Sequence, residues 1–223
     1  MCPLSFASDN NTVSHYFGDH ICSIYRTSAE QYSSVLPFLI DGLIRHQKCV
    51  YVTDERTVTE ITDELFHRGF PVSKYISSMQ MVFYTKEETY LSHGYFDADH
   101  LIATISAGIR DSRIDGYKGV RASGEMTWAL NNATTPDKLV AYESQLNAAF
   151  PGEHIDIFCQ YNETKFLPDV LTDILRTHPK VCLYGNVYDN TYFYTPPEWM
   201  SLSDPSTARS AYKEMIREII SAQ

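Results

Sequence analysis

The sequence predicts a single α/β domain in which a mostly parallel β-sheet carries helices on both faces. Short apolar segments rich in β-forming residues alternate with segments whose apolar residues recur at helical spacing. The first such unit, at residues 20–55, has the order strand, helix, strand, and its crossover connection makes the two strands parallel. The length of 223 residues suits one domain of this class.

The predicted elements follow one another in the same alternation. The first helix is expected to begin after an N-cap at Thr27 or Ser28, and Gly69 and Pro179 mark the ends of two later helices. The strands are expected at residues 20–25, 48–55, 79–84, 118–124, 155–160 and 181–184. The helices are expected at residues 28–43, 58–68, 100–114, 139–150 and 166–178, and a loop at residues 87–100.

The two ends of the chain differ from this pattern. Residues 1–14 are polar and are expected to form a flexible arm, which leaves residues 15–200 as the domain. Residues 206–223 predict a helix whose apolar side carries Tyr212, Met215, Ile219 and Ala222. Spacings of three and four residues are typical of a short coiled-coil seam, used for signalling or for a homodimer. The alternative is a helix that packs on its own domain.

Composition excludes several classes of protein. A net charge of −10 argues against direct binding of nucleic acid, which depends on basic side chains. No apolar stretch approaches the ~20 residues of a membrane span, and residues 1–11 lack the pattern of a secretory signal, so we expect a cytoplasmic protein. The five cysteines form no C-x-x-C pair, which indicates neither a disulfide framework nor a zinc ribbon. The sequence requires no particular cofactor.

The first strand–helix unit resembles the phosphate-binding region of RecA-like and KaiC-like ATPases. The helix end Phe38-Leu-Ile-Asp-Gly-Leu43 and the acidic pair Asp54-Glu55 carry this resemblance. Aligned on Phe38, the loop glycines fall at Arg26 and Glu30 and the lysine at Gln31, so the loop lacks the groups that hold phosphate. With no other catalytic motif, we expect a degenerate P-loop and no enzyme; a divergent nucleotide-binding enzyme is the alternative.

A longer series of motifs resembles the MEDS domain, the methanogen/methylotroph DcmR-type sensory domain. The motifs are His20-x-Cys22-x-x-Tyr25, Phe38 to Leu43, Cys49 to Glu55, Gly119 to Trp128, Tyr142-Glu143, Cys159-Gln-Tyr161, His178-Pro179 and Asn190. The resemblance covers residues 15–200 and implies a ligand-sensing domain with a RecA-like core. It also implies small carbon compounds as ligands, and a histidine kinase or a transcription regulator as the signalling partner.

A ligand site is expected where the carboxyl ends of the strands meet, in the degenerate nucleotide cleft. The candidate ligand-binding residues are His20, Cys22, Tyr25, Asp54, Glu55, Arg121, Glu125, Trp128, Cys159, Tyr161 and Asn190. Structural alternatives exist for these residues. Arg121 and Glu125 can form a salt bridge with each other, and Trp128 can be a core residue instead of a pocket wall.

His20 and Cys22 are also candidate metal ligands. Alternate residues of a strand point to the same side, and imidazole nitrogen and thiolate sulfur bind zinc, copper and iron. Cys159 or His178 would complete a site for a metal ion or a haem, which makes a metal- or haem-binding redox sensor a further alternative.

Overall fold

A computed structural model describes residues 18–131, 133–193 and 205–222 of the chain. Seven strands form one sheet in the order β3-β2-β4-β5-β1-β6-β7. All neighbouring strands are parallel except β6 and β7. The strands are β1 (His20–Tyr25), β2 (Lys48–Thr53), β3 (Met81–Thr85), β4 (Val120–Glu125), β5 (Ile155–Asn162), β6 (Lys180–Leu183) and β7 (Asn186–Asp189).

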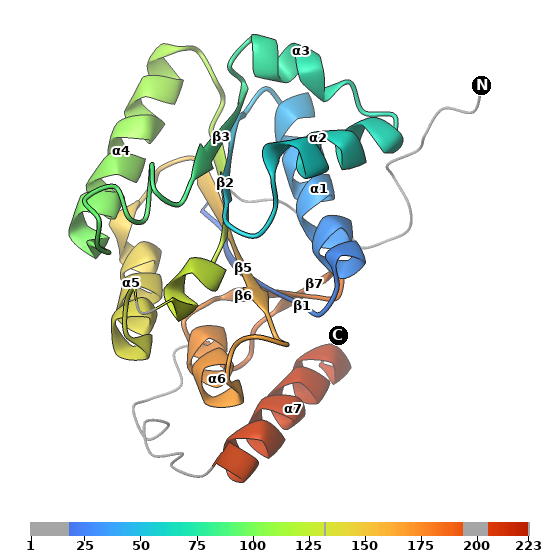
Figure 1. Cartoon of the computed structure of the whole chain (residues 1–223), viewed down its shortest axis with the longest axis vertical. Coiled ribbons are helices and arrows are strands. Elements are labelled where there is room, and N and C mark those ends of the chain that lie inside the picture. The colour runs from blue at the N-terminus through green and yellow to red at the C-terminus, as the bar shows by residue number, and fades with distance from the viewer. Residues whose placement is uncertain (1–17, 132, 194–204, 223) are drawn as a thin grey trace.

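Helices cover both faces of the sheet (Figure 1). One apolar core lies between the sheet and α1 (Ser28–Ile44), α2 (Val58–His67) and α3 (Val72–Ser77). A second core lies between the opposite face and α4 (Ala98–Ile114), α5 (Pro136–Ala149), α6 (Pro168–Arg176) and α7 (Pro205–Ser221). A short 3₁₀ turn, η1 (Thr127–Leu130), follows β4. The predicted α/β class, with a mostly parallel sheet between two helical layers, is confirmed.

Strand β1 lies inside the sheet and contributes to both cores. All six of its residues are buried, with Ile21 in the α1 core and Cys22 and Ile24 in the opposite core. Beside it, β5 pairs in a register that places Cys22 opposite Cys159. The helices that leave these two neighbouring strands, α1 and α6, cover opposite faces, which makes the β1–β5 border a topological switch point.

Local sequence signals explain several element boundaries. The Thr27 side chain accepts a hydrogen bond from the backbone N–H of Glu30, so Thr27 is the N-cap of α1. Thr57 and Glu60 form a reciprocal capping box at the start of α2. Helix α5 begins at Pro136, three residues before the predicted start, because proline suits the first turn of a helix.

Two short elements escaped prediction. Helix α3 has six residues and strand β7 has four, so neither is long enough to show a clear hydrophobic period. Strand β7 is also the antiparallel edge of the sheet. The expected loop at 87–100 ends earlier, because Asp97 caps α4, which starts at Ala98.

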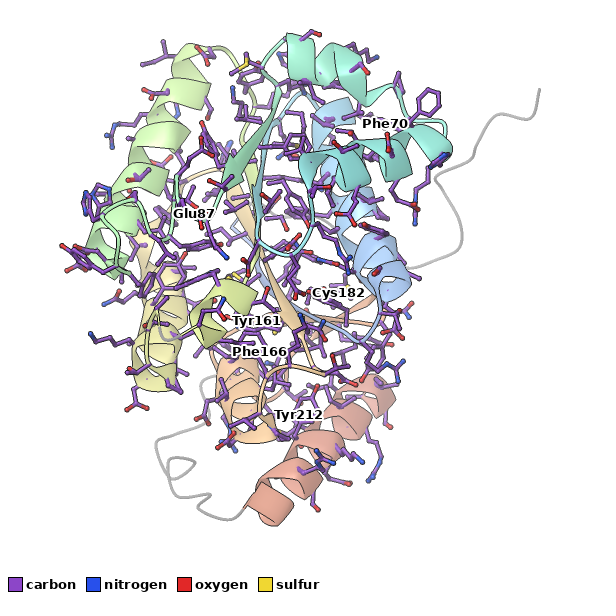
Figure 2. The ribbon with its side chains drawn as sticks, viewed as in Figure 1. Phe70, Glu87, Tyr161, Phe166, Cys182 and Tyr212 are labelled. Atoms are coloured by element: carbon purple, nitrogen blue, oxygen red, sulfur yellow. The ribbon has the colours of Figure 1, made fainter. Side chains whose placement is uncertain are left out.

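The apolar side of α7 packs on its own domain. Tyr212, Met215, Ile216 and Ile219 are buried in the core that α5 and α6 share. Figure 2 shows Tyr212 on α7 beneath Phe166 and Tyr161, and the Tyr212 hydroxyl donates to Glu163 at 2.8 Å. The seam residues Tyr212, Met215 and Ile219 therefore contact the domain that precedes them. The predicted arm at 1–14 and the boundary at residue 200 lie outside the described residues.

Among the residues that the structure describes, no helix is long and apolar enough to cross a membrane.

Candidate functional site

Four metal-ligating side chains meet in the core beneath α5. His20 comes from the start of β1, Cys159 from β5, Glu143 from α5, and His178 from the turn between α6 and β6. All four side chains are buried, and one donor atom from each lies within 4.8 Å of the others. We call these four residues the His–Glu–Cys cluster.

The carboxylate of Glu143 is the centre of this cluster. Its Oε2 atom lies 3.1 Å from Nε2 of His20 and 3.5 Å from both Nε2 of His178 and Sγ of Cys159. The Cys159 sulfur lies 3.5 Å from Nε2 of His20. The other carboxylate oxygen, Oε1, accepts a hydrogen bond from the Tyr161 hydroxyl. One charged group is thus held by side chains from three other elements.

The outward nitrogens of both imidazoles face acceptors. Nδ1 of His178 lies 2.8 Å from the carbonyl oxygen of Ile174 and 3.0 Å from the Thr177 hydroxyl, which itself donates to that carbonyl. Nδ1 of His20 lies 3.1 Å from Oδ1 of Asn147. Carbonyl oxygens only accept, so the geometry assigns a proton to Nδ1 of each ring.

The amide of Asn147 is itself fixed in orientation. Its Nδ2 atom donates to the carbonyl oxygen of Thr177 at 2.7 Å and lies near those of Glu143 and Ser144. Three carbonyl acceptors on the nitrogen side leave the Oδ1 atom facing His20. In the neutral rings, Nε2 of His20 and Nε2 of His178 therefore both point lone pairs at the Glu143 carboxylate.

Burial and neighbouring charges shift the pKa values of the cluster. Burial raises the pKa of the Glu143 carboxyl, but interactions with His178 and His20 outweigh it and hold the pKa well below its usual range. Burial, assisted by His178, lowers the pKa of His20. Burial and the Glu143 charge raise the pKa of the Cys159 thiol. Such a cluster can hold a proton between its members or bind a cation.

A cavity of about 350 Å³ opens beside the cluster, at the amino-terminal edge of the sheet. His20 and Asn147 contribute to its wall, and His20 is the member of the cluster that borders it. The rest of the lining is mostly apolar: Gly18, Asp19, Leu146, Phe150, Ile155, Ile157, Pro179 and Phe193.

The carboxyl-terminal edge of the sheet holds a different polar network, around the buried Glu125. Its Oε2 atom accepts from the backbone N–H groups of Asp54, Glu55 and Arg56, and its Oε1 atom accepts from the Tyr51 hydroxyl at 2.8 Å. Burial raises the pKa of Glu125 to about 7, against the opposing effect of these hydrogen bonds. Three successive backbone donors are a typical anion-binding arrangement, and here this chain's own carboxylate occupies it.

Side chains of the same chain also fill the position of the degenerate phosphate loop. Arg56 donates to Gln31 at 3.0 Å and to Ser28 at 2.6 Å, and Gln31 in turn donates to Gln160 at 3.0 Å. Further out, Lys165 pairs with Glu55. The residue aligned with the missing lysine, Gln31, is therefore part of an internal hydrogen-bond chain.

The predicted site residues separate into two groups and two outliers. His20, Cys22 and Cys159 lie in the core beneath α5. Tyr161 donates a hydrogen bond to Glu143 there. The side-chain amide of Asn190 donates to the carbonyl oxygens of Leu175 and His178 and so holds the turn that carries His178. Tyr25, Asp54, Glu55 and Glu125 lie toward the carboxyl-terminal edge. The four cluster atoms include His20 and Cys159 but not Cys22, the predicted partner of His20.

Two further predicted residues, Arg121 and Trp128, contact other residues of the chain. Arg121 is the second residue of β4, where it donates to Asp41 and to the carbonyl oxygen of Phe38, both at 2.6 Å, and lies 3.6 Å from Asp156. The alternative of an Arg121–Glu125 salt bridge is therefore wrong. Trp128 is fully buried and stacks on Tyr90 at 4.6 Å, as expected for a core tryptophan.

Sequence reasoning missed Glu143, Asn147 and Arg56 as site residues. Glu143 carried a signal, because it lies on the apolar side of α5 between Leu139 and Leu146, where an unpaired charge is costly. Asn147 lies one turn further along the same side of the helix. Arg56 carried no comparable signal, because its partners Gln31 and Ser28 lie on α1, far from it in the sequence.

Comparisons with known proteins agree with this architecture. A solved structure, the flagellar accessory protein FlaH from Methanocaldococcus jannaschii, superimposes with a TM-score of 0.52 at 14% identity, over 78% of this chain and 76% of that one. This likeness shows a RecA-like fold. No curated protein matches the sequence. The profile of MEDS, the MEthanogen/methylotroph, DcmR Sensory domain, matches residues 19–179, which implies a sensory role in signalling. The chain therefore belongs to the MEDS family of sensory domains.

Proposed function

We propose that this chain is a small-molecule sensor without catalytic activity, which passes its signal to a histidine kinase or a transcription regulator. Family membership supports the sensory role. The observation that carries the choice of site is the cavity of about 350 Å³ at the amino-terminal edge, which falls in the size range of small-molecule pockets.

The degenerate nucleotide cleft, where the sequence analysis expected the ligand, is a weaker position. Gln31, Arg56 and Gln160 bond to one another there, and Glu125 occupies the backbone donors of the loop after β2. A ligand would have to displace these paired groups, which costs their hydrogen bonds. The same observation argues against a divergent nucleotide-binding enzyme, and Mg-ATP is expected to bind weakly or not at all.

The amino-terminal cavity suits a compact ligand that has both an apolar part and a polar group. Its apolar walls include Leu146, Ile155 and Ile157, and its polar residues are Asp19, His20 and Asn147. Short-chain alcohols and amines have this chemistry. One polar contact to His20 or Asn147 would fix the orientation of such a molecule.

The output of the sensor is proposed to pass through α7. Its buried side packs on α6, and Pro179, which lines the cavity, lies shortly after the end of α6, so a ligand in the cavity can shift the contact between the two helices. The exposed side of α7 is charged, with Arg217 and Glu214 paired at its surface, and offers the surface for a partner or a second copy.

Nuclear magnetic resonance tests the proposal with methanol and methylamine as probes. Amide shifts are expected at Leu146, Ile155 and Ile157, and Leu146→Phe, which fills the cavity, is expected to abolish them. Leu139→Phe makes the same change on α5 outside the cavity and serves as the control. Probe-induced shifts confined to Glu125 and Gln160 would move the ligand to the nucleotide cleft and contradict this choice of site.

A further inference from the structure

We infer that His20, Glu143, Cys159 and His178 form a binding site for one divalent transition-metal ion, and that zinc fits the site best. This inference does not depend on the small-molecule proposal, because metal binding is measured on the chain alone. It rests on the spacing of the donor atoms, on the protons of the two imidazoles and on the balance of charge.

The spacing of the donor atoms fits a tetrahedral ion. Ligand atoms at 2.0–2.3 Å from zinc lie roughly 3.3–3.8 Å from one another. Oε2 of Glu143 lies 3.1 Å from Nε2 of His20, 3.5 Å from Nε2 of His178 and 3.5 Å from Sγ of Cys159. Small adjustments therefore bring all four atoms around one ion, whereas a haem ring does not fit among donor atoms that all lie within 4.8 Å.

The protons of the imidazoles favour an ion over an internal network. With Nδ1–H of each ring directed outward, Nε2 of His178 has no hydrogen-bond partner among the described residues, although it is fully buried and lies 3.5 Å from a carboxylate. A proton on Nε2 of His20 would let that ring donate a hydrogen bond to Glu143. Nε2 of His178 would still lack a hydrogen-bond partner among the residues that the structure describes. A second proton on His178 would place two imidazolium rings with their centroids 4.0 Å apart.

The outer hydrogen bonds match those of metal-binding histidines. Such residues donate their second N–H to a carbonyl or carboxylate, which fixes the ring and exposes the other nitrogen. The carbonyl oxygen of Ile174 has this role for His178, and Oδ1 of Asn147 has it for His20. Tyr161 holds the remaining oxygen of Glu143 in the same way.

Charge balance supports a divalent ion. One thiolate and one carboxylate carry two negative charges, and the two neutral imidazoles carry none, so a divalent ion leaves the buried site neutral. Binding of the ion displaces the proton of the Cys159 thiol, because the thiolate is the form that binds metal.

Titration of the full chain with Zn²⁺ and Co²⁺, after removal of metal with a chelator, tests the inference. We expect one ion per chain and a sulfur-to-cobalt charge-transfer band in the Co²⁺ spectrum. Cys159→Ser is expected to remove the band and to weaken Zn²⁺ binding by more than the roughly 10–100-fold typical of lost outer-shell partners. Cys22→Ser alters a buried cysteine on the same side of the neighbouring strand and should keep the band.

The inference fails if the folded wild-type chain binds neither ion stoichiometrically, which would leave a hydrogen-bond network as the role of the cluster. It also fails if Cys22→Ser removes the charge-transfer band and Cys159→Ser keeps it. Should Cys159→Ser not fold, the band in the wild type and in Cys22→Ser still decides. A band present in both supports the site; its absence from the folded wild type overturns it.

Discussion

Two buried carboxylates on opposite faces of one sheet are satisfied in opposite ways. Glu125, on the face of α1, accepts hydrogen bonds from three backbone N–H groups and the Tyr51 hydroxyl. Glu143, on α5, accepts one hydrogen bond from a hydroxyl group. Its other neighbours are two imidazole nitrogens, which present lone pairs, and the thiol of Cys159. The first carboxylate is complete within the chain, whereas the second has a geometry that one cation completes.

The pKa values of the two groups move in opposite directions. Burial raises that of Glu125 to about 7, whereas the two histidines hold that of Glu143 well below its usual range. The comparison shows that burial alone does not decide the state of a carboxylate in this core. Burial outweighs the hydrogen-bond partners at Glu125, whereas the two histidines outweigh burial at Glu143.

The largest difference in unfolding free energy, and in its response to zinc, is expected when each carboxylate is replaced by alanine. Glu125→Ala leaves buried donors without an acceptor and should cost roughly 3–5 kcal/mol of unfolding free energy, whether zinc is present or not. Glu143→Ala should abolish the stabilisation by zinc, which amounts to about 2.7 kcal/mol at a hundred times the dissociation constant. Urea unfolding with zinc and with chelator measures both effects. A zinc response that is lost in Glu125→Ala and kept in Glu143→Ala would reverse the assignment.

The second prediction concerns the pH dependence of stability. The folded chain holds the proton of Glu125 more tightly than the unfolded chain does. The free energy that this proton contributes to folding is therefore fully present below pH 4.5 and is lost as the pH rises to about 7. The change amounts to about 3 kcal/mol. Tyr25, Tyr51, Asp54 and Arg56 face this group.

Glu125→Gln, which does not ionise, should lose this pH dependence. Urea unfolding of the wild type and the variant at several pH values between 4.5 and 8 measures the difference. Equal slopes of unfolding free energy against pH in the two proteins would show that Glu125 is ionised throughout this range.

A smaller effect on zinc affinity is expected from a residue that contacts one of the four ligands without binding the ion itself. Asn147→Ala removes the acceptor of the Nδ1 proton of His20, and this change should weaken zinc binding roughly 10–100-fold while the chain stays folded. Ser144→Ala, on the same helix but without a side-chain contact to His20, is the control. Competition against a chromophoric zinc chelator gives both affinities. Unchanged affinity in Asn147→Ala would exclude an outer-shell role.

The smallest effect is expected at the rim of the carboxyl-terminal edge. Arg26 pairs with Glu30 at 2.6 Å, but half of its side chain is exposed, so the pair should contribute at most about 1 kcal/mol. Arg26→Ala, measured by thermal unfolding at low and high salt, should therefore change stability little. A loss of several kcal/mol would mean that the rim, and not Glu125, holds this edge of the sheet together.

The sequence was sufficient for the fold but only partly for the site. Alternating periods of apolar residues predicted the strands and helices other than α3 and β7, because a buried parallel sheet needs apolar strands and amphipathic helices. His20 and Cys159 were named from strand positions and family motifs, and the structure brings them together. Glu143 was not named as a site residue, since only packing of α5 over the sheet turns its side chain toward His20.

The errors in the site prediction have a common physical cause. The hypothesis assumed that polar residues of parallel strands collect at the carboxyl ends, yet His20 begins β1 and Arg121 lies near the start of β4. A strand has two faces as well as two ends, and the strand order determines which residues meet. Arg121 instead pairs with Asp41 of α1. The strand order is a long-range property, which one sequence does not display.

We propose that the side of the sheet beneath α5 binds a cation, whereas the buried polar groups on the α1 side are satisfied by hydrogen bonds within the chain. X-ray absorption at the zinc edge, on the chain loaded with one equivalent of zinc, tests it most directly. We predict one sulfur neighbour at about 2.3 Å and three nitrogen or oxygen neighbours at about 2.0–2.2 Å, with the sulfur lost in Cys159→Ser. A zinc shell of oxygen and nitrogen alone, unchanged in that variant, would contradict the claim.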